Sequence, residues 1–309
     1  RVFGPGPSSH TLWRGYDGQE GSTVGKISRT FSLMRASWEV LKQDKELLLF
    51  PLLSGVCCLF VLAPFAGPLV ALADWQAAGD NMVAGAAQAI DASDGKLTGA
   101  EVARIAALFL FYCCNYFVII FFNAGLIACA EIRMEGGDPS VGDGLRAAWA
   151  RLPAIAGWAL LAGTVGLILR MIEERSSIAG QIAAALVGMA WSITSFLVVP
   201  ILVIENEGPI SALRRSASML KTTWGEQIIG NFSFGLIFML LALPGVLIMF
   251  MGVAGGNVAV IVMAVVYFLV IALIQSALQG IFQAALYLYM RDGSAPEGFE
   301  AEALRSSIG

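Results

Sequence analysis

The stretch that decides the fold is residues 258–290, VAVIVMAVVYFLVIALIQSALQGIFQAALYLYM, in which no residue is charged. About 20 apolar residues at 1.5 Å per residue cross a hydrocarbon core of about 30 Å, so a run of this length predicts a membrane span. In lipid the backbone must satisfy its own hydrogen bonds, and a helix does so.

Similar uncharged runs recur upstream. We expect spans at residues 47–73, 102–130, 152–173, 178–204, 227–253 and 258–290. The composition agrees, because 57% of the 309 residues are apolar and only 14% are charged, whereas soluble domains carry about 25% charged residues. The sequence therefore predicts an all-α, polytopic bundle of six transmembrane helices over residues 27–290. Residues 1–26 are expected to form a flexible extension or linker, and residues 291–309 a tail.

The basic residues predict the orientation of these spans. Of the 19 Lys and Arg residues, all but four lie before the first span, in the 2–3 and 4–5 connections, or in the tail. Because cytoplasmic loops carry the excess of Lys and Arg, both termini are predicted to be cytoplasmic. We expect a multi-pass protein of the bacterial inner membrane. The four exceptions are Lys96, Arg104, Arg170 and Arg175.

The segments that enter spans 1, 3 and 5 resemble one another. They read MRASWEVL (34–41), LRAAWARL (145–152) and LRRSASML (213–220), each with Leu six residues after the first Arg. This repeat predicts three hairpins, each preceded by a short amphipathic helix at the cytoplasmic interface. For the first copy, a simple extension of the span is an equal alternative. The predicted lipid or partner contacts are Arg35, Trp38, Arg146, Trp149, Arg214 and Arg215.

Two stretches carry a family resemblance. Residues 31–53, FSLMRASWEVLKQDKELLLFPLL, resemble the opening of an uncharacterised bacterial six-helix integral-membrane family. Residues 205–220 look like the membrane domains attached to some glycerophosphodiester phosphodiesterases. The resemblance covers roughly residues 27–290 and implies the fold but no activity. The chain has no phosphodiesterase domain, so that chemistry does not carry over.

Polar residues inside the spans are few. Gln275, Gln279 and Gln283 follow one another at four-residue steps, so they share one face of the last helix, and Tyr287 continues the row. A polar face of this kind either bonds neighbouring helices or lines a wet path, and bonding between helices is the favoured interpretation. The predicted intramembrane face consists of Gln275, Gln279, Gln283, Asn115, Asn123 and Asn231.

Ionisable side chains are missing from the middle of every span. Glu131 and Glu205 lie near the cytoplasmic ends instead, where we expect them to pair with interfacial arginines such as Arg146 and Arg214. His10 is the only histidine, so the bundle offers no triad and no histidine metal site. We therefore do not expect an enzyme. We also do not expect a proton-coupled carrier, because such carriers usually keep a buried carboxylate.

Two further patterns resemble metal sites but also have purely structural interpretations. Residues 91–101, DASDGKLTGAE, resemble a calcium loop, but Gly95 at the sixth position puts Ile90 at the first, where no side-chain ligand is possible. We interpret it as a polar turn. The pairs Cys57–Cys58 and Cys113–Cys114 could bind copper(I) if their helices met near mid-bilayer, but cysteine is also a small apolar filler. No cofactor and no nucleic acid are expected.

Two hypotheses follow. The first is a non-enzymatic scaffold or accessory subunit that binds membrane lipids and protein partners, or forms a homo-oligomer. The second is a transporter or channel for a small neutral or lipid-like solute, which would use the Gln275, Gln279 and Gln283 face. A cavity along that face would favour the second hypothesis, and tight packing would exclude it.

Overall fold

The computed structural model describes residues 23–72, 99–175, 178–221, 229–301 and 304. Every regular element within these residues is helical. The elements are α1 (Thr23–Gln43), η1 (Lys45–Leu48), α2 (Leu49–Leu72), α4 (Gly99–Met134), α5 (Val141–Ala150), α6 (Leu152–Arg175), α7 (Ile178–Thr194), α8 (Val198–Ile204), α9 (Pro209–Lys221), α10 (Ile229–Ala254) and α11 (Val258–Asp292).

Six helical segments within the described residues are long and apolar enough to cross a membrane. They match the predicted spans closely, and the all-α class is confirmed. α1 begins at Thr23, four residues before the predicted start of the fold at residue 27. The segments are Lys45–Pro64, Ala106–Met134, Leu152–Glu173, Gly180–Ile204, Ile237–Ala254 and Val258–Asp292.

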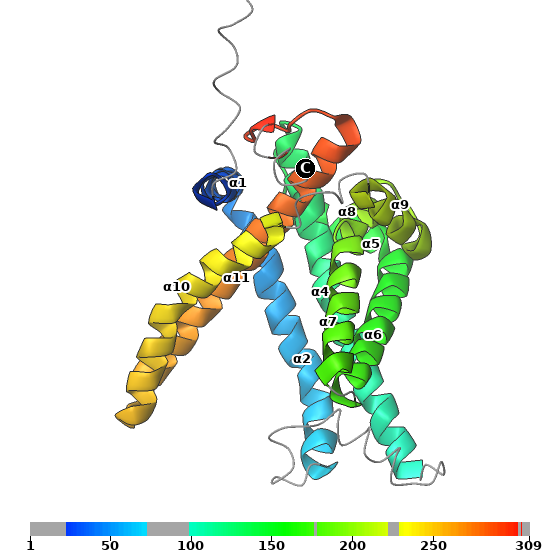
Figure 1. The fold of residues 1–309 in the computed structure, drawn as a ribbon, viewed down its shortest axis with the longest axis vertical. Helices are drawn as coiled ribbons and strands as arrows, with labels where there is room; N and C mark the ends of the chain where they lie inside the picture. The colour runs from blue at the N-terminus through cyan, green and yellow to red at the C-terminus, as the bar shows by residue number, and fades with distance from the viewer. Residues whose placement is uncertain (1–22, 73–98, 176–177, 222–228, 302–303, 305–309) are drawn as a thin grey trace, which may run out of the picture.

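The long helices form two groups that diverge. α2, α4, α6 and α7 run side by side, whereas the α10–α11 hairpin leans away from them (Figure 1). The two groups meet near the end where α1, α5, α8 and α9 lie, which we call the short-helix end. There α11 is buried from Ala277 to Leu288, apart from Gln279, while its first turns are exposed, with Val258 70% accessible. The core therefore sits at the short-helix end.

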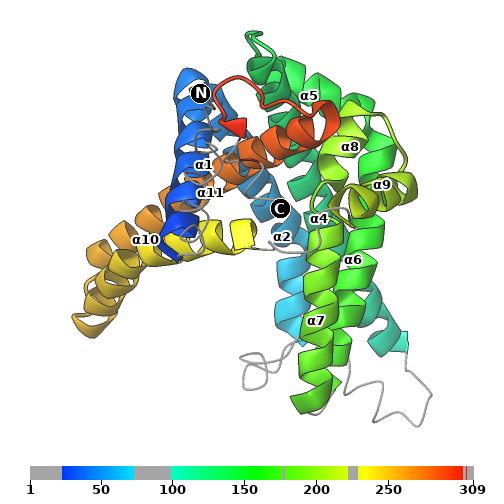
Figure 2. The same cartoon turned by 45° about the horizontal axis from the view of Figure 1, so that its top comes forward.

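α1 is a separate helix that lies across the direction of the bundle. It is seen nearly end-on in Figure 1 and lengthwise in Figure 2. Leu33, Ser37 and Val40 are buried on its inner face. Phe31 and Trp38 stay exposed, at 58% and 38%. Because a 3-10 turn separates α1 from α2, α1 is not a straight extension of the first span.

α5 packs so tightly on α4 that two glycines are required. A Cβ at Gly144 would lie 2.5 Å from the Phe50 ring and 2.6 Å from the Gly125 carbonyl oxygen. A Cβ at Gly125 would lie 2.6 Å from the same ring. Phe50, at the start of α2, is thus wedged against both glycines and is 1% exposed. The missing side chains let three helices meet at one point.

α5 begins with a capping box, in which two residues satisfy the free groups of the first turn. The backbone N–H of Asp143 donates to Ser140 Oγ (3.3 Å), and the N–H and hydroxyl of Ser140 both donate to the Asp143 carboxylate. These bonds to Ser140, with Arg146 nearby, hold the pKa of Asp143 below its usual range. The Ser-x-x-Asp spacing thus defines where α5 starts.

The fourth span is divided into α7 and α8. Its backbone pattern breaks at residues 195–197, three to five residues before Pro200, which has no N–H to donate. α2 and α10 run through their own prolines as single helices. α5 and α6 are separate helices, since α5 ends at Ala150 and α6 starts at Leu152.

Candidate functional site: the polar row of α11

Four polar residues follow one face of α11 at four-residue steps and a fifth extends the row. Gln275, Gln279, Gln283, Tyr287 and Arg291 lie above one another on the helix. Their surroundings differ along the row. Gln283 is 8% exposed and Tyr287 is fully buried, whereas Gln279 is exposed. The row therefore divides into a packed part and an open part.

Gln283 ties three helices together. Its Nε2 donates to the backbone carbonyl of Phe196, and its Oε1 accepts from Asn123 Nδ2 at 3.4 Å. The Phe196 carbonyl would normally accept from the N–H four residues later, but that residue is Pro200. Gln283 of α11 thus satisfies the group that the break between α7 and α8 leaves free.

Tyr287 joins α11 to the end of α8. Its hydroxyl donates to Glu205 Oε1 at 2.5 Å. The other oxygen of Glu205 pairs with Arg215 Nε of α9, also at 2.5 Å. One carboxylate therefore holds α8, α9 and α11 at the short-helix end.

Arg291 ends the row with a second ion cluster. It lies 3.3 Å from Glu131 and 3.5 Å from Glu135, both at the end of α4. The prediction that Glu131 and Glu205 pair with arginines such as Arg146 and Arg214 is therefore wrong in its partners. Arg146 points outward, 81% exposed, and pairs with Asp143 of its own helix at 3.0 Å.

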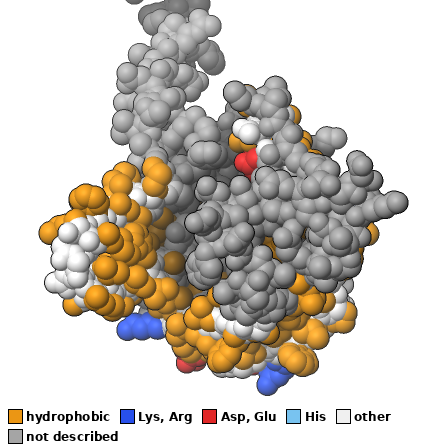
Figure 3. Space-filling view, turned by 90° about the horizontal axis from the view of Figure 1, so that it is seen from below, with side chains coloured by type: hydrophobic (Ala, Val, Ile, Leu, Met, Phe, Trp, Pro, Cys, Tyr) orange, Lys and Arg blue, Asp and Glu red, His pale blue; other side chains and the backbone are white. Residues whose placement is uncertain are grey.

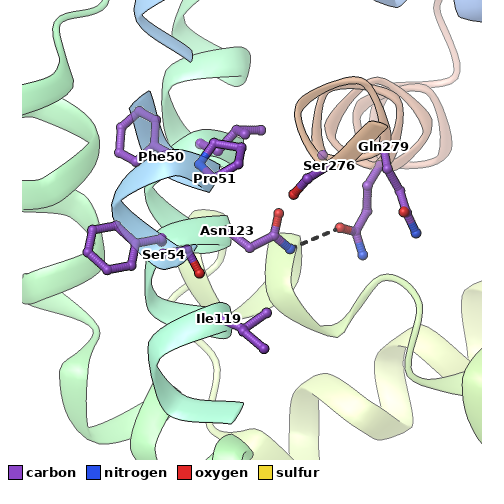
Figure 4. A pocket seen from close by; sticks show the side chains of 11 residues that line it. Phe50, Pro51, Ser54, Ile119, Asn123, Ser276 and Gln279 are labelled. Carbon is purple, nitrogen blue, oxygen red and sulfur yellow. Dashed lines mark hydrogen bonds between the residues drawn. The ribbon is translucent and has the colours of Figure 1, made fainter. Parts of the chain in front are cut away.

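The open part of the row borders a pocket of about 220 Å³. α2, α4 and α11 contribute its walls, and Figure 4 shows Asn123 reaching from α4 toward Ser276 and Gln279 on α11. No residue of the lining is charged. The lining residues are Phe50, Pro51, Ser54, Ile119, Phe122, Asn123, Leu126, Ser276, Gln279, Gly280 and Gln283.

The remaining residues of the predicted polar face are placed elsewhere. Gln275 does not line this pocket. Asn115 donates to the Phe111 carbonyl of its own helix at 3.0 Å, so it does not join the row. The side chain of Asn231 lies outside the described residues. The structure thus brings together Asn123, Gln279 and Gln283, and adds Ser54 and Ser276, which the sequence analysis did not single out.

The predicted interfacial residues lie near the surface of the short-helix end. Trp149 is 68% exposed and touches Phe121 of α4 edge-on, with ring centres 6.2 Å apart. Arg35 and Arg214 are exposed. Trp38 is exposed, and Arg215 is held by Glu205 as described above.

An ion pair at the short-helix end escaped the sequence analysis. Asp44, at the turn between α1 and η1, binds Arg133 of α4, which also pairs with Asp138 at 2.6 Å. Asp44 is 8% exposed. The signal was available, since a carboxylate and a guanidinium both stood at predicted span ends, but nothing in their spacing showed that they meet.

The cysteine pairs can be compared with the structure in part, whereas the calcium-like loop cannot. Cys113 Sγ faces α6, 3.2 Å from where a Cβ of Gly163 would be, which is the packing expected of a small apolar filler. No group of three metal-ligating side chains is found among the described residues. The calcium-like loop 91–101 lies mostly outside the described residues, so its interpretation stays a prediction.

Comparison with protein families gives one match. Residues 102–298, well over half of the chain, match the model of a family of unknown function, DUF6159. The chain belongs to this family. The DUF6159 match begins in α4, so the stretch 31–53 that carried the earlier resemblance lies outside it. Nothing found supports the likeness to glycerophosphodiester phosphodiesterase membrane domains, and no curated protein matches the chain.

Proposed function

We propose that this protein is a non-enzymatic integral membrane protein that acts by contact, binding lipids and partner proteins as a scaffold or accessory subunit. It would lie in the bacterial inner membrane with both termini in the cytoplasm. The uncharacterised DUF6159 family and the six apolar helices agree with a membrane protein of this kind.

The α10–α11 hairpin carries the proposal. Over its outer part its two helices pack mainly on each other, through contacts such as Gly245 against Tyr267 and Phe268. Large side chains stand out from both helices, including Phe250 at 72% and Leu247 at 64% exposure. In the view from below, hydrophobic side chains cover much of the described surface on the side where this hairpin lies, with other side chains and backbone between them (Figure 3). Such a hairpin offers a second protein an extended apolar helical surface.

The short helices support the lipid half of the proposal. α1 lies across the bundle with Phe31 and Trp38 exposed beside Arg35, and α5 exposes Trp149. Aromatic groups at the acyl boundary with cations among the phosphates are typical of interfacial helices. We infer that α1, α5 and α9 are three copies of one interfacial helix, each of which enters a two-span hairpin.

Transport of a small neutral solute is the second candidate, and the pocket beside Gln279 is the observation that favours it. Toward the short-helix end, however, the row is closed by Gln283 and Tyr287, which are buried and hydrogen-bonded. The pocket therefore supports binding better than passage. Solute uptake into proteoliposomes that Gln279→Leu abolishes would favour transport over contact.

The experiment for the contact function is photo-crosslinking in native membranes. A photoreactive amino acid at Phe250 of the hairpin is compared with one at Leu186 of α7, which is 60% exposed. We expect protein adducts from position 250 and only lipid adducts from position 186, as identified by mass spectrometry. If position 250 also gives lipid adducts alone, the partner-binding proposal is wrong.

A further inference from the structure

The pocket between α2, α4 and α11 has an unusual lining for the inside of a membrane span. Ser54, Asn123, Ser276 and Gln279 present hydroxyls and amides to it, and Gln283 closes one side. Neither the Ser276 hydroxyl nor the Gln279 amide has a hydrogen-bond partner among the described residues. In hydrocarbon an amide without a partner costs several kcal/mol. A hydrogen-bonding occupant is therefore required when the protein is in a bilayer.

The size of the pocket indicates more than a single bound water. Its volume of about 220 Å³ is well above the roughly 30 Å³ that one water takes in the liquid. One wall is polar, and the other consists of Phe50, Pro51, Ile119, Phe122 and Leu126. This two-sided lining suits a molecule with a small polar part and an apolar part.

The charge of the lining restricts the occupant further. No Lys, Arg or His lines the pocket, and the pocket lies within the apolar segments of α2, α4 and α11. A phosphate there would be desolvated without a counter-charge, which is strongly unfavourable. The polar part of the occupant must therefore be uncharged.

The pocket is open toward the surrounding bilayer. Ile119 at its rim is 52% exposed, and Ser276 and Gln279 are exposed as well. α2 and α11 diverge from one another away from the short-helix end (Figure 1). An acyl chain can therefore leave the pocket between these two helices, directly into lipid.

We propose that this pocket binds the uncharged, hydroxyl- and ester-bearing head of a membrane lipid of the diacylglycerol type. The hydroxyl and ester carbonyls pair with the Gln279 amide, Ser276 and Asn123, and the acyl chains extend past Ile119 and α2. The proposal rests on the lipid-binding half of the proposed function and does not depend on a protein partner.

The test uses a photoactivatable diacylglycerol with the full-length protein in nanodiscs. We expect labelling of peptides from residues 115–126 and 273–285, competed by unlabelled dioleoylglycerol and not by dioleoylphosphatidylglycerol. Gln279→Leu should lower labelling about fivefold, the effect of losing one hydrogen bond. Gln275→Leu, one turn away and outside the pocket, is the matched control and should label like the wild type.

Three results would overturn the proposal. Labelling that Gln279→Leu leaves unchanged would place the probe elsewhere. Equal competition by phosphatidylglycerol would contradict an uncharged-head site. Competition by free glycerol as strong as by dioleoylglycerol would assign the pocket to a soluble polyol rather than a lipid. None of these results bears on the crosslinks from Phe250, so the two proposals fail separately.

Discussion

Pro200 removes the backbone N–H that would otherwise close a helical turn on the Phe196 carbonyl. In water such a carbonyl would be solvated, but inside a membrane span it needs a partner from the protein. Gln283 is that partner, and it lies on a different span. One side chain of α11 thus compensates for one proline of the fourth span.

Gln283→Leu is expected to lower the free energy of unfolding by about 1–2 kcal/mol, because the Phe196 carbonyl and Asn123 both lose a bond. Unfolding in mixed micelles, followed by tryptophan fluorescence, measures the change. Gln275→Leu is the control on the same face of α11 and should change the value by less than about 0.5 kcal/mol. Equal effects from the two substitutions would show that the Phe196 contact does not stabilise the fold.

The hydrogen bonds of Asp143 predict how the stability of the protein depends on pH. Its hydrogen bonds with Ser140 lower the pKa of the folded carboxyl, so the stabilisation is complete above the ordinary value of about 3.9 and is lost as the pH falls through the lower, folded value. The melting temperature of the wild type should exceed that of Asp143→Asn at pH 6 to 7. The difference should shrink as the pH falls below about 4. A difference that stays constant through this fall in pH would contradict the capping role.

Among the elements, α5 is held against α4 by the absence of two side chains. Gly125 and Gly144 leave the space into which the Phe50 ring fits. Small residues at helix contacts are a general means of close packing in membranes. Here they also connect the start of α2 to the pair.

Gly144→Ala should destabilise the protein by about 1–3 kcal/mol, because the new methyl group meets the Phe50 ring and the Gly125 carbonyl. The control is Gly142→Ala in the same helix, where the added Cβ comes no closer than 3.6 Å, to Ser140 Oγ. Thermal unfolding of the two variants in detergent compares them directly. Equal melting temperatures would mean that α5 can shift outward at no cost.

At the scale of the whole molecule, the two longest helices among the described residues are longer than the hydrocarbon core is thick. α4 has 36 residues and α11 has 35, which at 1.5 Å per residue gives about 54 and 52 Å against a core of about 30 Å. α11 meets this excess in part by leaning away from α4 (Figure 1). The lean is what opens the bundle on the side of the pocket.

The orientation of the molecule in the membrane can be tested by labelling introduced cysteines. Cysteines introduced as Glu173→Cys, in the last turn of α6, and Ser218→Cys, in α9, lie at opposite ends of the bundle and are both exposed. A membrane-impermeant maleimide should label position 173 in intact spheroplasts and position 218 only after permeabilisation. The reverse pattern would contradict cytoplasmic termini.

Much of this architecture could be predicted from uncharged runs, because length and apolarity alone determine a span. The row from Gln275 to Tyr287 followed from helical periodicity. The partners of Glu131 and Glu205 could not be predicted, since they depend on which helices meet. Ser54 and Ser276 were missed for the same reason, because a serine in a span gains significance only beside a cavity.

The bond from Gln283 to Phe196 can form only late in the synthesis of the protein. The fourth span is synthesised before the sixth, so the Phe196 carbonyl lacks its partner in the membrane until α11 has been inserted. A nascent chain that stops before residue 283 leaves that carbonyl, and Asn123 of the second span, without this partner. The last helix therefore marks completion of the bundle, and an interrupted chain differs chemically from a finished one inside the bilayer itself.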